Sequence, residues 1–362
     1  MSTFKDILYI EMITLKEIAE QGKVSIATVS NILNGKTNVS EETRKRVLKI
    51  IKETGYKPNY MARGLRAAST KTICLIVDDI SEFSSPTIIN GIMARLEANG
   101  YKTILENLRF YSKWGHDWEH TDAYKKSIEA AIEEFSIIKT DGIIYVAGHA
   151  REITELPSSL QVPLVICYAF TKREGTPCIM IDDKSAAFAM TEHFIENKQF
   201  KIGVITGAAN NIHTDERLEG YKMALAAHNI SFDNRLVKTG NWYSNSGYEG
   251  CKALLSDFPD LSAIFCFNDI MAAGVYKYLN ETGRKPGKDI SVTGFDNRDI
   301  STLVMPPLTT MEIPLFSVGE TGAQTLLDMI KEKSEDADAK FDNKKIYIPC
   351  TLIDRNSVIK NK

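Results

Sequence analysis

The sequence predicts a small all-helical head followed by a larger α/β body made of two lobes. Two observations lead to this prediction. The first sixty residues carry the capping and spacing signals of three short helices. From residue 72 onward, short apolar runs alternate with helical patterns. A chain of 362 residues is also long enough for two or three domains.

The composition is that of an ordinary globular protein, with 43% hydrophobic and 25% charged residues. No apolar run approaches the ~20 residues that cross a bilayer. The first residues lack the basic start and the small-residue cleavage site of a secretory signal. We therefore expect a cytoplasmic protein with no membrane partner. The six cysteines never form a close pair, so we expect buried, reduced thiols.

The net charge of -3 hides an asymmetry between the two parts of the chain. Residues 1–71 hold 13 Lys and Arg against 7 Asp and Glu, a net charge of +6, whereas residues 72–362 hold 31 against 40, a net charge of -9. A basic head on an acidic body indicates that the head contacts a polyanion. Many small domains reach such a charge by chance. Charge alone therefore does not identify a polyanion-binding head, and a sequence motif is needed as well.

Helix signals divide the head into three segments. Thr14 and Glu17 have the spacing of a capping box, which predicts that the first helix starts there. Ser25 is a good N-cap for a second helix. A third helix is predicted from Ser40 to Gly55, where glycine is a common helix stop.

The second helix has an informative surface. Val29, Ile32 and Leu33 share one side and should point inward. The outward residues are Ile26, Ala27, Ser30 and Asn31, with Thr28 and Asn34 at the edges. These side chains are short and uncharged, as a helix entering the DNA major groove requires. Periodicity alone leaves open a generic three-helix unit with a polar face.

The head resembles that of the lactose-repressor (LacI/GalR) family. The resemblance rests on TLKEIAEQGKVSIATVSNILNG (14–35) and VSEETRKRVLKIIKETGYKPNYMARGLR (39–66). It implies that Ile26, Ala27 and Asn31 read base edges. It also implies that phosphates are held by Ser25, Thr28, Ser30 and Asn34. One departure is Lys23, which replaces the usual turn glycine and is expected to adopt a positive φ at some cost in stability.

The segment Asn59–Arg66 is shorter than the ~12–15 residues that an isolated helix needs in water. Its composition therefore favours a flexible linker. The resemblance implies instead a hinge helix that orders on operator DNA and pairs with its twin. In that interpretation Leu65 enters the minor groove, flanked by the charges of Arg63 and Arg66.

The body is predicted to contain parallel sheets covered by helices. Its expected strands lie at 72–77, 102–106, 142–146, 163–167, 201–206, 263–267 and 290–294. Further apolar segments at 308–311 and 346–353 suggest two lobes joined by several crossings. The polar run 333–345 is expected to be a solvated loop.

The body also resembles its LacI/GalR counterpart, which implies a periplasmic-binding-protein-like (type I) fold with two doubly wound parallel-sheet lobes. The strongest stretches are FNDIMAAGVYKYLNETGRKPGKDISVTGFDN and PPLTT. The expected domains are a helix-turn-helix head at 1–57, a hinge at 58–71 and an effector-binding and dimerisation domain at 72–362. Lobe 1 is expected at about 72–168 and 312–338, and lobe 2 at about 169–311 and 339–362.

The resemblance also implies a small-molecule site between the lobes, at Phe83, Tyr168, Arg217, Trp242, Asn268 and Asp296. A guanidinium, a carboxylate and an indole ring suit the polar edges and apolar face of a sugar. As alternatives, Asp296 caps a turn and Trp242 belongs to the core. Tyr168 and Ile313 depart from sugar-binding members of the family, which argues against a plain galactoside.

Three classes of protein remain to be compared. A transport binding protein would explain the body alone. An enzyme lacks support because GxGxxG, Walker, GxSxG and HExxH motifs are missing. His116 and His120 have zinc-ligand spacing, but we interpret them as an exposed loop or helix start and expect no metal or cofactor. The sequence therefore predicts a homodimeric repressor that binds a near-palindromic operator under control of a sugar or sugar-derived effector.

Overall fold

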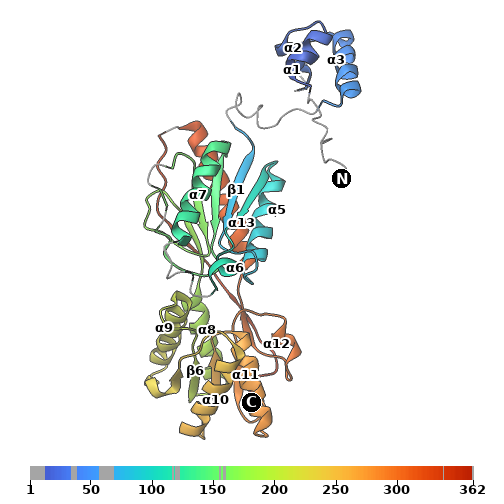
Figure 1. Ribbon diagram of the computed structural model, residues 1–362. Helices are drawn as coiled ribbons and strands as arrows, with labels where there is room; N and C mark the ends of the chain where they lie inside the picture. The colour runs from blue at the N-terminus through green and yellow to red at the C-terminus, as the bar shows by residue number, and fades with distance from the viewer. Residues whose placement is uncertain are drawn as a thin grey trace, which may run out of the picture. The chain divides into compact units, whose positions relative to one another are not determined.

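The computed structural model divides the chain into two units, Met1–Thr70 and Lys71–Lys362 (Figure 1). It describes residues 13–33, 39–56, 69–115, 118, 123–154, 156–157, 160–336 and 338–360. Within these ranges, every helix is too short or too polar to span a membrane. The first unit holds the head and the second holds the body.

The three predicted head helices are confirmed as α1 (Leu15–Gln21), α2 (Ile26–Leu33) and α3 (Glu41–Thr54). The capping box is present, since the Thr14 hydroxyl accepts from the Glu17 amide at 3.3 Å and the Glu17 carboxylate accepts from the Thr14 amide at 2.6 Å. The Ser25 hydroxyl accepts from the Thr28 amide at 3.1 Å. Local side-chain chemistry therefore fixes where these helices begin.

A small apolar core holds the three head helices together. Its buried members are Ile18, Ala19, Val29, Ile32 and Val47. Arg46 of α3 donates from Nε to the carbonyl oxygen of Gly22 at 3.1 Å and so ties α3 to the turn before α2. In that turn Lys23 adopts the expected left-handed conformation, with a φ of 51°.

The first lobe of the body is built on a six-stranded parallel sheet, in the order β11-β5-β4-β3-β1-β2. Its strands are β1 (Thr72–Val77), β2 (Lys102–Asn107), β3 (Gly142–Val146), β4 (Leu164–Cys167), β5 (Cys178–Ile181) and β11 (Lys345–Ile348). Helices α5 (Ser85–Ala98) and α13 (Leu315–Glu335) cover one face, and α7 (Ala123–Ile138) covers the other. Alternate residues of β1 enter the two cores, as a strand between helical layers requires.

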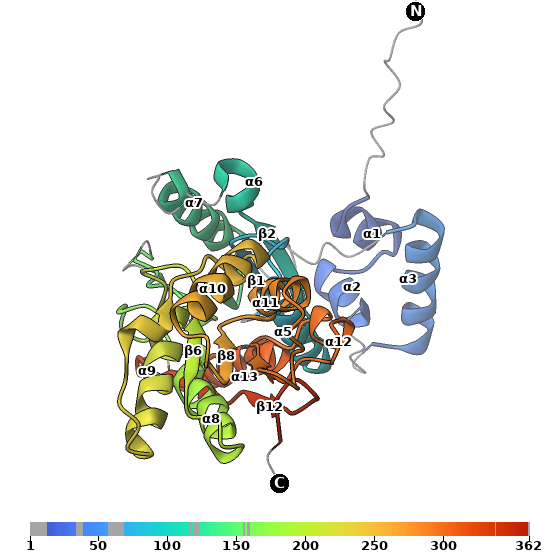
Figure 2. The ribbon, with the colours of Figure 1, turned by 90° about the horizontal axis from the view of Figure 1, so that it is seen from below.

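The second lobe contains a four-stranded parallel sheet, in the order β7-β6-β8-β9. Its strands are β6 (Ile202–Ile205), β7 (Val237–Lys238), β8 (Ala263–Cys266) and β9 (Ser291–Thr293). Figure 2 shows α8 (Asp183–Glu196) and α9 (Ile212–Ala227) on one side of it, and α10 (Ser244–Asp257) and α11 (Asp269–Glu281) on the other. The short α12 (Ile300–Leu303) and the antiparallel pair β10 (Thr310–Glu312) and β12 (Thr351–Ile353) complete the lobe.

The sheet topology corrects the predicted limits of the lobes. Residues 169–181 and 345–348, predicted in lobe 2, belong to lobe 1, because β5 and β11 extend the first sheet. The apolar segment 346–353 splits between β11 and β12, which join different sheets. The predicted loop 333–345 is also too long, since α13 continues to Glu335.

Two glycines allow α5 and α13 to cross at close range. A Cβ added at Gly319 would lie 2.0 Å from the carbonyl oxygen of Ile88, and one at Gly91 would lie 2.2 Å from that of Phe316. Because these neighbours are backbone atoms, they cannot yield as a side chain does. The two helices would have to move apart to accept any larger residue.

We expect Gly319→Ala to lower the free energy of unfolding by about 1–3 kcal/mol, the usual effect of overpacking. Urea denaturation of the full chain measures this change in the free energy of unfolding. The control is Glu332→Ala, at an exposed position of the same helix. Its free energy of unfolding should stay within about 0.5 kcal/mol of that of the unsubstituted chain. Unchanged stability of Gly319→Ala would show that the helices are not this close.

Candidate functional site

The predicted effector residues gather where the parallel strands end. Tyr168 directly follows β4, while Asn268 and Asp296 follow β8 and β9 within a few residues. Trp242 lies beyond the end of β7. Ligands of open parallel sheets bind at this edge, because loops there project side chains past the strand ends.

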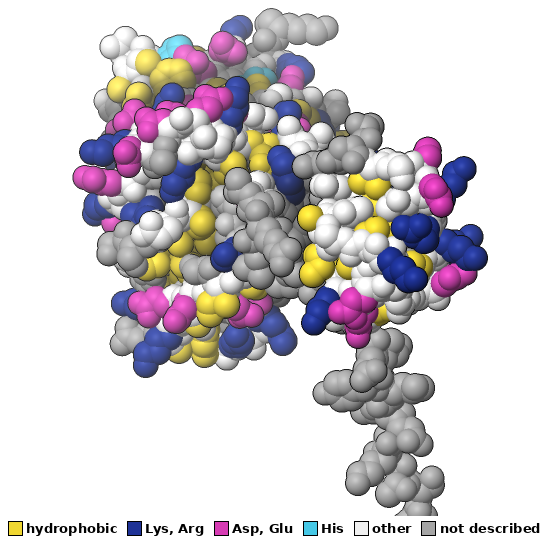
Figure 3. Space-filling view, turned by 90° about the horizontal axis from the view of Figure 1, so that it is seen from above, with side chains coloured by type: hydrophobic (Ala, Val, Ile, Leu, Met, Phe, Trp, Pro, Cys, Tyr) yellow, Lys and Arg dark blue, Asp and Glu magenta, His cyan; other side chains and the backbone are white. Residues whose placement is uncertain are grey.

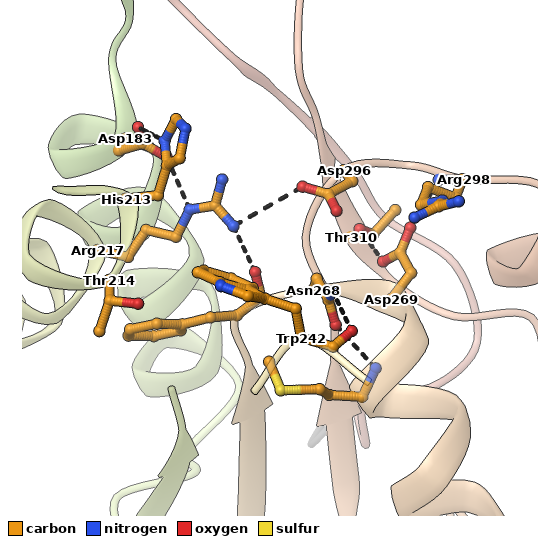
Figure 4. Close-up of polar contacts among 12 residues, drawn as sticks. Asp183, His213, Thr214, Arg217, Trp242, Asn268, Asp269, Asp296, Arg298 and Thr310 are labelled. Atoms are coloured by element: carbon orange, nitrogen blue, oxygen red, sulfur yellow. Dashed lines mark hydrogen bonds and ion pairs between the residues drawn. The ribbon is translucent and has the colours of Figure 1, made fainter. Parts of the chain in front are cut away.

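Arg217 lies at the centre of the cluster (Figure 4). Its Nε donates to Asp183 Oδ1 at 2.7 Å, and Nη1 donates to the carbonyl oxygen of Phe267. Nη1 also lies 3.7 Å from Asp296 Oδ1. The guanidinium carbon is 3.6 Å from the ring centroid of Phe295, a cation–π contact. The side chain is only 3% exposed, so these contacts hold a charge that water does not reach.

Asp183 and His213 also belong to this cluster, although no sequence pattern singled them out. Asp183 Oδ2 pairs with His213 Nδ1 at 2.7 Å while Oδ1 accepts from Arg217. Burial raises the pKa of Asp183, but His213 and Arg217 outweigh it and hold that pKa below its usual value. Asp183 follows the unpredicted strand β5, so recognising that strand would have pointed to it.

The pKa of a second buried carboxyl, that of Asp296, is shifted in the opposite direction. Burial raises its pKa to about 8, although the charge of Arg217 opposes the shift. Burial likewise raises the pKa of Asp269 to about 7. Asp269 accepts from the Thr310 hydroxyl at 2.6 Å and from the Arg298 amide at 2.7 Å, so it holds the loop that carries Asp296.

Asn268 and Trp242 form one wall of the cluster. Asn268 Oδ1 accepts from the Met271 amide at 2.8 Å and caps α11, while Nδ2 donates to the carbonyl oxygen of Trp242 at 2.9 Å. The indole lies directly over Gly207, where an added Cβ would be 1.9 Å from the ring. The half-buried ring is therefore held in one orientation.

Phe83 and Tyr168 face this cluster from the first lobe. The Arg298 guanidinium lies 4.8 Å from the ring centroid of Phe83, which is 37% exposed. Tyr168 has a φ of 67°, and its buried ring lies 5.1 Å from the imidazole of His213. Thus four predicted residues lie together in the second lobe, and the other two contact its Arg298 and His213.

The face of α2 that the spacing predicts to point outward is exposed in part. Ser25, Ile26 and Ala27 are exposed, and Thr28, Ser30 and Asn31 are half-buried. The Ser25 and Thr28 hydroxyls are 2.9 Å apart. Figure 3 shows Lys and Arg side chains close together on the head, whose helix α3 carries Arg44, Lys45, Arg46, Lys49 and Lys52. The predicted contacts Asn34, Arg63 and Leu65 lie outside the described residues.

Metal-ligating side chains do not cluster in the part of the chain that the structure describes, where no group of three His, Cys, Asp or Glu could hold an ion. His116 and His120 lie outside it. The six cysteines are free, and five of them are buried.

Two family models match the chain. One described as "Bacterial regulatory proteins, lacI family" matches residues 14–59, which include α1 to α3. Another, "Periplasmic binding protein-like domain", matches residues 191–358 of the body. The two matches agree with the division into head and body.

Similar proteins cover nearly the whole chain. It is 31% identical over 351 residues to the HTH-type transcriptional regulator MalR of Clostridium butyricum, covering 95% of this chain and 98% of the relative. It is 27% identical over 324 residues to the ribose operon repressor of Haemophilus influenzae, a match that covers 90% of this chain and 94% of the relative. The crystal structure of the lac repressor dimer bound to operator and the anti-inducer ONPF has the same fold, with a TM-score of 0.77 at 21% identity over 96% of this chain and 99% of that chain.

The raised pKa values of Asp296 and Asp269 predict how stability varies with pH. Such carboxyls bind a proton more tightly in the folded chain, so they stabilise the fold at low pH and lose that effect as pH rises from about 4 to about 8. We expect the free energy of unfolding in urea to fall across this window, by at most about 1.4 kcal/mol per pH unit for each group. Asp296→Asn should reduce the slope, whereas Asp299→Asn, at an exposed position, should not. An unchanged slope in Asp296→Asn would contradict the burial argument.

Proposed function

The chain belongs to the lacI family of bacterial regulatory proteins, and from this membership we propose that it is a cytoplasmic, sequence-specific DNA-binding repressor of a carbohydrate-utilisation operon. Its affinity for the operator is controlled by a small sugar or sugar-derived effector bound between the lobes. One relative, similar over 90% of the chain, is a ribose operon repressor, which supports this class of target.

The exposed face of α2 supports the DNA-binding part of the proposal. Ile26 is 39% exposed, and the residues around it are small or uncharged. Short side chains allow a helix to approach base edges closely, while Lys and Arg elsewhere on the head attract phosphates. Ile26, Ala27 and Asn31 are proposed to read bases. Ser25, Thr28, Ser30 and Asn34 are proposed to hold phosphates, with Arg63 and Leu65 acting in the hinge.

Exposed apolar residues support a homodimer. Ile104 and Leu105 on the edge strand β2 and Met93 on α5 are each more than a third exposed. Leu303, the last residue of α12, and Met305 just after it are 72% and 73% exposed. Both ribbon views place α5 and α12 on the same side of the body. An edge strand and an apolar surface of this kind favour burial against a second copy. A two-fold dimer would read a near-palindromic operator.

The chemistry of the cluster supports a sugar-sized polar effector. Arg217 offers donors, Asp296 and Asp183 offer carboxyl oxygens, and Trp242 offers a flat apolar face. Thr214 Oγ1 is buried and has no hydrogen-bond partner among the described residues, so a ligand hydroxyl would satisfy it. Because Tyr168 and Phe83 add aromatic surface from the first lobe, we propose a sugar that is less polar than a plain galactoside, or differently substituted.

Control of DNA binding follows from the position of the cluster. Phe83 and Tyr168 belong to the first lobe, and Arg217, Trp242, Asn268 and Asp296 belong to the second. An effector that contacts both sets favours one angle between the lobes over the others. That angle sets the spacing of the two hinge segments in a dimer, and therefore the fit of the paired heads to the operator.

One combined observation supports the proposal most strongly. The head exposes the short, uncharged side chains of α2, and the body of the same chain holds a polar cluster that both lobes contact. A gel-shift assay tests it, using the full chain, genomic fragments that include the DNA upstream of its own gene, and a panel of sugars and sugar phosphates. We expect retardation of a particular fragment at moderate ionic strength and a change in its affinity with one class of sugar. Equal binding to all fragments under every condition would contradict the proposal.

We expect Asn31→Ala to weaken binding to the retarded fragment by roughly tenfold or more, because a paired contact to a base contributes about 1–3 kcal/mol. Binding to random DNA should change little, since phosphate contacts dominate there. Fluorescence anisotropy with both DNAs measures the difference. Glu20→Ala, at an exposed position of α1, is the matched control and should affect neither DNA. Equal losses on both DNAs would remove Asn31 from base reading.

A further inference from the structure

We propose that His213 is a positioning residue that couples the charged cluster of the second lobe to closure of the first lobe upon it. It does so by accepting a hydrogen bond from the backbone N–H of Ala150. The inference rests on the proposed function, because it identifies the residue through which the effector site senses lobe closure.

The contact joins the two lobes directly. The amide of Ala150 lies 3.1 Å from His213 Nε2, and both residues are buried. Ala150 follows strand β3 of the first lobe, and His213 lies in the first turn of α9 in the second lobe. Asn211 fixes that turn, because its side chain accepts from the His213 amide at 3.0 Å.

Two hydrogen bonds define the tautomer of this imidazole. An amide N–H can only donate, so Nε2 must be the unprotonated acceptor. The ring proton then belongs to Nδ1, which donates to Asp183 Oδ2 at 2.7 Å. The neutral Nδ1–H form therefore satisfies both neighbours at once, and a ring that carries a proton on Nε2 does not.

The donor is held in place by its own loop. Asp78 accepts from the Gly148 amide at 3.0 Å and pairs with Arg151, while the Ser84 hydroxyl donates to the Gly148 carbonyl at 2.8 Å. The Arg151 carbonyl accepts from the Phe170 amide at 3.0 Å. Residues 148 and 151 are thus anchored on either side of Ala150, which holds its N–H in the direction of His213.

The acceptor is held by the effector cluster itself. Asp183 shares its two oxygens between His213 and Arg217, and Arg217 in turn lies beside Asp296. Any ligand group that shifts Arg217 or Asp296 changes the orientation of Asp183. Because Asp183 orients the imidazole, the same shift alters the hydrogen bond to Ala150. Occupancy of the cluster is thereby linked to lobe closure.

The geometry of histidine suggests a matched pair of variants. Nδ1 lies two bonds from Cβ, as the amide group of Asn does, and Nε2 lies three bonds from Cβ, as the amide group of Gln does. His213→Gln therefore keeps an acceptor for Ala150 and gives up the bond to Asp183. His213→Asn keeps a donor for Asp183 and gives up the bond to Ala150.

Distance measurements between spin labels on the two lobes test the proposal in the full chain. The labels are attached at Glu129→Cys on α7 and Lys252→Cys on α10, which are exposed positions. The parent chain, treated with the same label, shows how much the native cysteines contribute to the signal. With labelled chain diluted in unlabelled chain, so that distances between the protomers of a dimer do not contribute, we expect one main distance in the parent and in His213→Gln. In His213→Asn we expect a roughly tenfold higher ratio of open to closed lobes, the effect of losing one buried hydrogen bond.

The reverse pattern, with His213→Gln open and His213→Asn closed, would show that His213 acts only by anchoring Asp183 and would overturn the proposal. So would two variants that both match the parent. If both substitutions disturb folding in circular dichroism, the nitrogen spectrum of ¹⁵N-histidine in the parent decides. A proton on Nδ1 of His213 supports the proposal, and a proton on Nε2 contradicts it. These measurements use neither operator nor effector, so they succeed or fail separately from the proposed function.

Discussion

The polar cluster of the second lobe is organised by a buried ion pair between Asp183 and Arg217, whose side chains are 4% and 3% exposed. Charges so far from water are tolerated only when their remaining polar atoms are satisfied, and removing one partner of such a pair costs about 3–5 kcal/mol. Here the carboxylate also holds His213, and the guanidinium also binds the Phe267 carbonyl and stacks on Phe295. The pair therefore orients His213, which contacts Tyr168 and Ala150 of the first lobe.

This constraint explains how a cluster at the ends of strands can act as a switch. Asp296 lies beside Arg217, and burial raises the pKa of its carboxyl to about 8. A ligand that bonds to both changes the balance of charge in a site that excludes water, where electrostatic interactions are strong. In the proposed function, the contacts of Phe83 with Arg298 and of Tyr168 with His213 are the route by which that change would reach the first lobe. A difference of a few kcal/mol between lobe arrangements is enough to shift their populations.

Much of the fold could be predicted because it depends on local signals. The capping box at Thr14 and the apolar run at 72–77 are readable from neighbouring residues, and both appear as expected. The four-residue strand β5 and the two-residue strand β7 escaped prediction, since such short runs carry no periodicity. The contact of His213 with Ala150 spans 63 residues and depends on the lobe arrangement, so no local pattern could indicate it. The predicted effector positions came from family resemblance. The pKa shifts of Asp183 and Asp296 depend on burial and on charged neighbours distant in the sequence, which no local pattern reveals.

The central proposal is that an effector bound between the lobes controls the affinity of the head for operator DNA. Thermodynamic linkage tests it most directly, because coupling between two sites is reciprocal. Calorimetric titration would give the affinity of the active sugar with and without saturating operator DNA, and DNA-binding assays would give the operator affinity with and without saturating sugar. We expect both ratios to be equal and to differ from one. A sugar that binds the body with the same affinity whether or not operator is present would contradict it.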